Sequence, residues 1–167
     1  MKRVLTIFLL IAALWPGLQA QVKAGEKTFG ITGGYATRNH SATAGLQLTY
    51  AFSRHFVLAP SVDYVFRNDD SDGILVNLDY HGPWQLDKEG RWDVYHILGI
   101  NYASWTTHSK DADNKDVSER RGRAGFDFGL GFAYNVTPTL RLHVQGKFNW
   151  LAHRNTGLFN AGISYVF

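Results

Sequence analysis

The feature that most constrains the fold of this chain is an alternation of bulky apolar residues with small or polar ones. In residues 125–134, "GFDFGLGFAY", phenylalanine, leucine or tyrosine occupies every even position, and glycine, alanine or aspartate every odd one. Successive side chains of a β-strand point to opposite faces, so a period of two predicts strands. The pattern recurs in residues 28–36, 44–52, 56–66, 74–81, 92–105, 140–150 and 158–167, which predicts eight strands and an all-β fold.

The stretch 92–105 is the least regular of the eight. Its polar residues, among them Asp93 and Asn101, occupy one face, but apolar residues occur on both faces from Tyr95 to Ile97. One extra residue in a strand shifts which face its side chains occupy. We therefore expect a β-bulge near His96.

The connections between the strands fall into two alternating sets. Short ones follow residues 52 and 134, and a longer one, from Gly82 to Arg91, is punctuated by Pro83 and Gly90. The other set is polar and charged, and its longest member runs from about Thr106 to Arg121. Short turns on one rim and longer polar loops on the other are typical of outer-membrane barrels, whose long loops face outwards. The pattern predicts a transmembrane, antiparallel, up-and-down β-barrel with both termini in the periplasm.

Barrel size indicates which face meets lipid. The interior of an eight-stranded barrel is just wide enough for side chains, so rows of phenylalanine and tyrosine would overfill it. We therefore expect the bulky face to point outwards to lipid and the face of small and polar residues to line the lumen. Beyond residue 20, no apolar run approaches the roughly 20 residues of a membrane-spanning helix.

Charged residues occur on the face assigned to the lumen. An unpaired charge in a narrow lumen is costly, so these residues should form a hydrogen-bonded network. An ion path through the lumen is the functional alternative to this structural plug. The predicted network consists of Asp63, Asp79, Asp93, Asp127, Arg123, Arg141, His143 and Lys147, with His81 on the same face.

Aromatic residues gather near the predicted strand ends. Amphipathic rings favour the two membrane–water interfaces, where they form girdles around a barrel. The residues expected in these girdles include Tyr64, Tyr80, Trp92, Trp105, Tyr134 and Trp150.

The first 20 residues have the layout of a secretory signal peptide. Lys2 and Arg3 precede an apolar run, and a small residue, Ala20, stands at the expected cleavage point. We expect cleavage after Ala20, with Ala24 as the alternative, and a barrel domain spanning residues 21–167. Without Lys2 and Arg3 the chain keeps 15 basic residues against 14 acidic ones, a net charge of +1, which gives no reason to expect nucleic acid as a partner. Cysteine is absent, which excludes disulfides and cysteine-ligated zinc.

The last strand ends in "GISYVF", in which Ile163, Tyr165 and Phe167 share one face. Together with the signal peptide and the eight strands, this ending resembles the small outer-membrane barrels of the OmpA membrane domain and the OmpX/Ail group. The resemblance implies that the barrel-assembly machinery recognises these three residues. We expect the strand to pair with residues 28–36 and close the barrel, which leaves no edge exposed to hydrocarbon.

No catalytic, cofactor or metal site is expected. His40–Ser41 and His108–Ser109 are adjacent in predicted loops, whereas the lipid A deacylase barrels carry histidine and serine two apart on one strand face. The acidic segments "NDDSDG" and "DADNKD" lack the distal glutamate of a calcium loop. The segment 118–123, "SERRGR", is a candidate contact for lipid phosphates, because arginine binds phosphate bidentately.

The sequence therefore predicts an integral outer-membrane protein with a structural or adhesin-like role carried by its surface loops and without enzymatic activity. Its expected partners are outer-membrane lipids and lipopolysaccharide, the barrel-assembly machinery, and a host or surface ligand bound through the loops; we expect a monomer. Two alternatives remain open: a narrow porin-like channel, and a secreted lipocalin-like barrel, which would need its bulky face inside.

Overall fold

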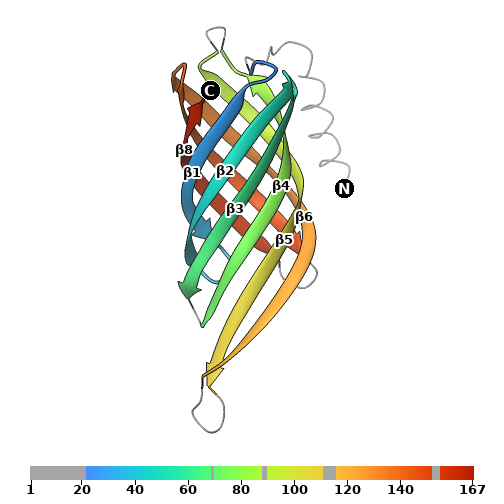
Figure 1. The fold of residues 1–167 in the computed structure, drawn as a ribbon, viewed down its shortest axis with the longest axis vertical. Helices are drawn as coiled ribbons and strands as arrows, with labels where there is room; N and C mark the ends of the chain where they lie inside the picture. The colour runs from blue at the N-terminus through green and yellow to red at the C-terminus, as the bar shows by residue number, and fades with distance from the viewer. Residues whose placement is uncertain (1–21, 69, 88–89, 111–115, 152–154) are drawn as a thin grey trace, which may run out of the picture.

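The structure, a computed structural model, describes residues 22–68, 70–87, 90–110, 116–151 and 155–167. The expected signal peptide, residues 1–20, lies outside the described residues. Eight strands form one closed barrel (Figure 1). They are β1 (Lys27–Ala36), β2 (Ser41–Ser53), β3 (Phe56–Asn68), β4 (Ser71–Gln85), β5 (Trp92–Lys110), β6 (Asp116–Thr137), β7 (Leu140–Leu151) and β8 (Thr156–Val166).

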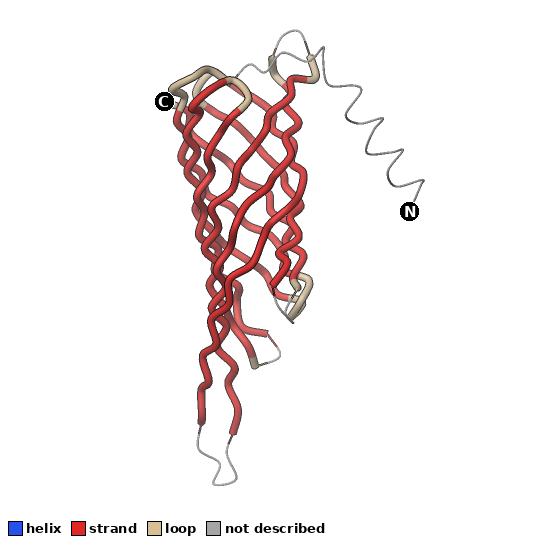
Figure 2. Tube along the Cα trace, turned by 90° about the vertical axis from the view of Figure 1, so that its right-hand side faces the viewer, coloured by secondary structure: helices blue, strands red, loops and turns tan. Residues whose placement is uncertain are grey.

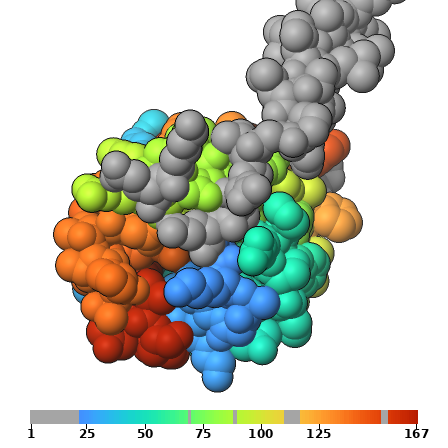
Figure 3. Space-filling view, turned by 90° about the horizontal axis from the view of Figure 1, so that it is seen from above, coloured from blue at the N-terminus to red at the C-terminus, as the bar shows by residue number. Residues whose placement is uncertain are grey.

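Each strand pairs antiparallel with the next, and β8 closes the barrel against β1. That closing register runs from Thr28 opposite Val166 to Ala36 opposite Leu158, as expected for the last strand. Seen from the rim that carries the C-terminus, β1 (blue) and β8 (red) lie side by side (Figure 3). Among the described residues, no helix is long and apolar enough to cross a membrane.

The bulky face points outwards, as the size argument predicts. Phe126 and Leu130, for example, are 66% and 57% exposed on the outer wall, whereas Asp127 between them is buried in the lumen. The same alternation holds along the barrel portions of all eight strands, but not in the hairpin, where residues 117–122 of β6 are all exposed.

The predicted bulge near His96 is wrong. The register of β5 against β4 is continuous from Gln85 opposite Asp93 to Ser71 opposite Thr107. Tyr95 and Ile97 therefore point into the lumen, where both are buried. Tyr95 fits because Gly131 stands opposite it on β6, and a β-carbon at Gly131 would collide with the tyrosine ring.

The longest predicted loop is also largely wrong. Instead of a loop from Thr106 to Arg121, β5 and β6 continue as a paired hairpin as far as Lys110 opposite Asp116. This hairpin extends well beyond the rest of the long-loop rim (Figure 2). Hydrogen bonds across the hairpin, such as that from Arg120 Nε to Ser104 Oγ at 2.6 Å, help to hold polar residues in strand conformation. Other polar segments expected as loops also continue as strand: β2 begins at Ser41, and β4 runs from Ser71 to Gln85.

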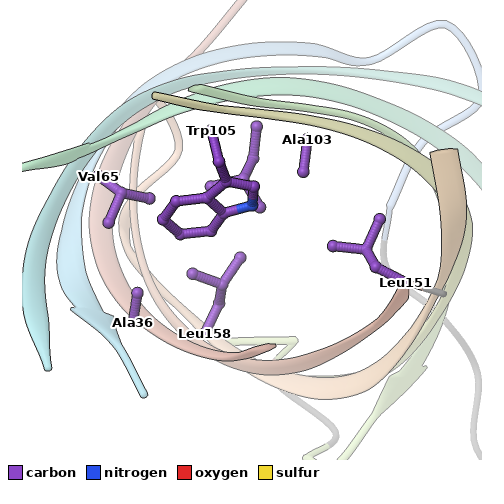
Figure 4. Close-up of a cluster of buried hydrophobic side chains, with 7 residues drawn as sticks. Ala36, Val65, Ala103, Trp105, Leu151 and Leu158 are labelled. Carbon is purple, nitrogen blue, oxygen red and sulfur yellow. The ribbon is translucent and has the colours of Figure 1, made fainter. Parts of the chain in front are cut away.

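The lumen contains more apolar volume than the sequence suggests. Near the long-loop rim the Trp105 indole lies inside the barrel with six smaller apolar residues (Figure 4). Smaller apolar clusters lie towards the rim that carries the termini. The cluster around Trp105 consists of Ala36, Val65, Leu75, Ala103, Trp105, Leu151 and Leu158. One of the smaller clusters consists of Val22, Ala51 and Val57, and the other of Tyr95, Ile97 and Ala133.

Candidate functional site

The centre of the lumen is occupied by an ion pair between β4 and β7. Lys147 Nζ lies 2.9 Å from Asp79 Oδ2, and both side chains are completely buried. Each residue is on an inward-facing position of its strand, which explains how two charges far apart in the sequence meet inside the barrel. A buried pair of this kind is stabilising only when hydrogen bonds satisfy the remaining polar atoms around it.

Asparagine and threonine side chains hold a second carboxylate, Asp63 on β3. Asn77 Nδ2 donates to Asp63 Oδ2 and Asn160 Nδ2 to Asp63 Oδ1, each at 3.1 Å. Thr32 Oγ1 on β1 donates to Asp63 Oδ1 at 3.5 Å. These bonds connect β1, β3, β4 and β8 across the lumen.

The third carboxylate, Asp127 on β6, receives hydrogen bonds from two asparagine amides, those of Asn101 and Asn149. Asn149 Nδ2 also lies 3.5 Å from Asn77 Oδ1, which joins the surroundings of Asp127 to those of Asp63. With Thr43 Oγ1 donating to Asn160 Oδ1 at 3.1 Å, all eight strands contribute to this central network.

A second polar group lies nearer the rim that carries the termini. Arg141 pairs with Glu26 at 2.9 Å and donates from Nε to Asn135 Oδ1 at 2.7 Å. Asn135 Nδ2 in turn donates to Asp93 Oδ2 at 3.3 Å. His143, on the same strand as Arg141, is buried with its Nδ1 3.3 Å from Ser164 Oγ.

The single charged network predicted from the sequence is therefore divided. Asp63, Asp79, Asp127 and Lys147 come together at the centre, whereas Asp93 and Arg141 meet near the rim. Arg123 also occupies an inward-facing position, opposite Ala103, but it is four residues along β6 from Asp127, about 13 Å of extended strand. Sequence reasoning missed Glu26, Thr32, Thr43 and five asparagines, Asn77, Asn101, Asn135, Asn149 and Asn160. The asparagines lie on the inward strand faces, like the aspartates, a signal that was available.

A cavity of about 50 Å³ adjoins this second polar group and is lined by Glu26, Asp93, Arg141, His81 and His143, among others. A buried water needs roughly 10–15 Å³ of such cavity volume, so the cavity has room for a few waters. On the far side of the cavity from the termini, the central network and then the Trp105 cluster fill the lumen in series. A solute entering from the rim that carries the termini would meet both layers.

Five of the six predicted interfacial aromatics face outwards near strand ends. Tyr64 and Trp150 lie towards the long-loop rim, and Tyr80, Trp92 and Tyr134 towards the other. The rings of Trp92 and Tyr134 are 4.5 Å apart. Their role in a membrane interface remains a prediction.

The assignment of Trp105 to an interfacial girdle is wrong. Its side chain is 1% exposed and points into the lumen. Gly73 stands opposite it on β4, and a β-carbon at Gly73 would lie 2.8 Å from the indole ring. The missing side chain at Gly73 is what allows a tryptophan inside so narrow a barrel.

The proposed assembly residues Ile163, Tyr165 and Phe167 all face outwards near the rim that carries the C-terminus. The backbone of Phe167 is paired with that of Lys27, with N–H···O distances of 3.0 and 3.3 Å. Their recognition by assembly machinery stays a prediction.

Side chains connect the strand ends and loops of the long-loop rim to one another. Asn68 Nδ2 donates to the carbonyl of Asn39 at 2.8 Å, and His108 Nε2 lies 2.7 Å from Asp72 Oδ1. His40 Nδ1 is hydrogen-bonded to the Tyr35 hydroxyl at 2.7 Å. In the part of the chain that the structure describes, which excludes Asp69 and residues 111–115, no group of three or more histidine, aspartate or glutamate residues could hold a metal ion.

Comparison with a protein family and comparison with solved structures lead to the same kind of barrel. The profile of the family described as "Outer membrane protein beta-barrel domain" matches residues 11–167. Among solved structures, the N-terminal β-barrel domain of OprF from Pseudomonas aeruginosa is 14% identical, with 87% of this chain and 100% of that one covered and a TM-score of 0.65. Ail, the attachment invasion locus protein of Yersinia pestis, is 16% identical, with coverages of 87% and 100% and a TM-score of 0.62.

Neisserial surface protein A is 13% identical, with 84% of this chain and 95% of that one covered and a TM-score of 0.60. No curated protein matches the sequence. At these identities the solved structures show the fold alone.

Proposed function

The chain belongs to the outer membrane protein β-barrel domain family, and from that premise we propose that its barrel is a closed membrane anchor whose protruding β5–β6 hairpin makes attachment contacts outside the cell. The observation that carries this proposal is the length of the hairpin beyond its neighbouring strands. Pairing of β4 with β5 ends at Ser71 opposite Thr107, and pairing of β6 with β7 ends at Gly125 opposite Leu151. The β5–β6 pairing continues to Lys110 opposite Asp116.

This difference in length leaves one side of β6 open. Residues 116–124 pair with β5, but within the described ranges no strand pairs with their other side. An open edge presents a row of backbone N–H and C=O groups that can bind an extended peptide as an additional strand. The partner proposed for this edge is therefore an extended segment of a surface protein.

The charged side chains of the hairpin suit an aqueous location outside the membrane. Arg121 and Glu119 are both well exposed and form an ion pair at 2.7 Å. Charged side chains on an edge strand disfavour indiscriminate pairing with other edges, so an open edge with charges is compatible with selective binding. The name of Ail, an attachment protein of the same fold, supports the proposed role by analogy.

The closed lumen supports an anchor over a channel. The Lys147–Asp79 network and the Trp105 cluster fill the barrel one after the other. We propose that the barrel does not conduct and has no catalytic activity. Conductance steps in planar bilayers that change on substitution of Lys147 or Arg141 would contradict the first statement.

The secreted lipocalin-like alternative is wrong. It requires the bulky apolar face inside the barrel, but side chains such as Phe126, Leu130 and Phe159 are 57–66% exposed on the outer wall. The family match also identifies an outer-membrane barrel.

Trimming the hairpin tests the attachment role. Replacing residues 108–118 with an Asn-Gly turn connects Thr107 to its cross-strand partner Glu119. Because this removes His108, Asp72→Asn is added so that the Asp72 carboxylate is not left without its partner. A bacterial host displaying this variant should lose most of its adherence to an epithelial monolayer, while the barrel keeps its heat-modifiable electrophoretic mobility. Undiminished adherence by the trimmed barrel would contradict the proposal.

A pair of proline variants tests whether the partner binds the backbone groups of the open edge or the side chains of the hairpin. Backbone N–H groups of neighbouring strand residues point to opposite sides, so Ser118→Pro and Glu119→Pro remove N–H groups from opposite sides of β6. The variant whose missing N–H group lies on the open side of β6 should keep the hairpin folded and still abolish adherence. If both variants adhere like the unmodified protein, the edge is not the contact.

A further inference from the structure

A groove on the outer wall of the barrel lies beneath the base of the hairpin. It has a volume of about 490 Å³ and is formed by two rows of side chains across β4, β5 and β6. One row is Val76, Tyr102 and Ala124; the next, farther from the long-loop rim, is Leu78, Ile100 and Phe126. Three adjacent strands span about 10 Å, which is wide enough for hydrocarbon chains to lie along the wall.

The groove exists because small side chains interrupt the bulky outer face. Ala124 forms part of its floor, between the larger Phe126 and the hairpin. In the row above, towards the long-loop rim, Gly122 stands opposite Ser104. A side chain at Gly122 would collide with the Tyr102 hydroxyl, so the tyrosine ring leans from its own row towards the rim.

Polar donors gather at the upper end of the groove. Arg120 belongs to the next row, opposite Thr106, but its Nε donates to Ser104 Oγ at 2.6 Å. The guanidinium therefore turns back to within one row of the groove, where the Tyr102 hydroxyl also lies. The bond to Ser104 uses one of the five N–H donors of the guanidinium.

Negative charge near this position is already engaged. Asp72 lies in the same row as Arg120, two strands away, but its carboxylate is bonded to His108 at 2.7 Å and to the Tyr64 hydroxyl at 3.4 Å. A cation placed directly above an apolar groove matches a lipid whose phosphate joins hydrocarbon chains.

We propose that this groove binds one phosphorylated, multiply acylated glycolipid of the lipid A type, with acyl chains along Val76, Ile100 and Phe126 and a phosphate on Arg120. The glycolipid is chosen over a phospholipid because the groove lies at the long-loop end of the barrel, the end that faces outwards in this topology. The proposal depends on the barrel's place in the outer membrane but not on the attachment role. The trimmed hairpin, which keeps Arg120, should lose adherence and still bind the lipid.

Native mass spectrometry of detergent-purified protein tests the site. Three probes are added at equal concentration: lipid A carrying its phosphates, the same lipid A without them, and phosphatidylglycerol. The unmodified protein should retain one phosphorylated lipid A and discriminate against the other two probes by about tenfold, the order expected for charge-assisted hydrogen bonds.

Two variants and two matched controls locate the binding. Arg120→Gln should lower occupancy by phosphorylated lipid A about tenfold, because it removes a charge-assisted hydrogen bond. Ala124→Phe should also lower it, because the larger side chain fills part of the groove. Arg121→Gln, which removes an arginine that is paired with Glu119, and Val144→Phe, which enlarges an outward residue on β7, should leave it unchanged.

Three results would overturn the proposal. Equal retention of dephosphorylated lipid A would remove the role of Arg120, and preferential retention of phosphatidylglycerol would make the occupant a phospholipid. A dimer peak that disappears in Ala124→Phe, without lipid loss, would make the groove a contact between two copies of the chain.

Discussion

Lys147 on β7 and Asp79 on β4 meet inside the barrel with their side chains 2.9 Å apart and no exposure to solvent. Two further carboxylates, those of Asp63 and Asp127, act electrostatically on the same lysine. The lysine is thus the positive centre of the central network, which contains the carboxylates of Asp63, Asp79 and Asp127 and the asparagine amides that bind Asp63 and Asp127.

Removing that positive charge should be costly. Lys147→Met leaves buried carboxylates without their counter-charge, which should lower the free energy of unfolding by roughly 3–5 kcal/mol. Urea unfolding in lipid vesicles measures the change, with Lys23→Met, at an exposed position, as the control. Adding Asp79→Asn to Lys147→Met should restore part of the loss; a double variant no more stable than Lys147→Met would contradict the coupling.

The Trp105 cluster should matter through packing rather than charge. Trp105→Ala removes the largest buried side chain of the described residues and should cost roughly 3–5 kcal/mol in unfolding free energy. Trp150→Ala, which removes an indole that is 63% exposed on the outer wall, is the matched control and should cost clearly less. Equal losses for the two tryptophans in the same urea experiment would argue against an inward Trp105.

The Lys147–Asp79 pair and Trp105 also show where sequence reasoning succeeds and where it fails. Alternation placed Asp79 and Lys147 on the lumen face correctly, because a charge on a strand otherwise facing lipid would be expensive. It failed for Trp105 because an aromatic ring is compatible with either face. The position was nevertheless decidable: Trp105 is an even number of residues from Asp93 and Asn101, so a continuous strand turns it inwards with them.

The length of the strands was predictable only up to the membrane. Apolar alternation ends where lipid ends, and beyond that point a polar strand and a polar loop have similar composition. What keeps β5 and β6 paired as far as Lys110 and Asp116 is cross-strand hydrogen bonding, which a single sequence does not reveal. The eight strands, their order and the closing pair β1–β8 needed only the period of two.

Substitution of Phe167 should affect assembly more than stability. Its side chain is 62% exposed and its contacts with Lys27 are through the backbone, so Phe167→Ala keeps those hydrogen bonds. We expect a strong decrease in the amount of folded protein in cell envelopes, but little change in urea unfolding of barrels refolded in vitro. Phe159→Ala removes an outward phenylalanine within β8 and is the control, which should assemble normally. Equal assembly defects would contradict a special role for Phe167.

The β4–β5 turn should respond to acid. The backbone N–H groups of Trp92 and Arg91 donate to the Asp87 carboxylate at 2.9 and 3.1 Å, and they hold the pKa of Asp87 below its usual value of 3.8. The pKa is lower in the folded state, so these bonds stabilise the turn above the unfolded value and are lost as the pH falls through the folded one.

An NMR titration of the Trp92 amide measures this response. Its chemical shift should change with a midpoint below pH 3.8, and Asp87→Asn should abolish the change. A midpoint at or above the usual value would show that the two hydrogen bonds do not form in solution.

Cysteine labelling tests whether the barrel lies in the outer membrane with the β5–β6 hairpin outside. The chain contains no cysteine, so single substitutions give an unambiguous signal. Glu119→Cys lies on the hairpin, and Val136→Cys lies near the β6–β7 turn at the opposite rim. With a membrane-impermeant maleimide, Glu119→Cys should be labelled in intact cells and Val136→Cys only after the outer membrane is permeabilised; labelling of Val136→Cys in intact cells while Glu119→Cys stays protected would contradict the account.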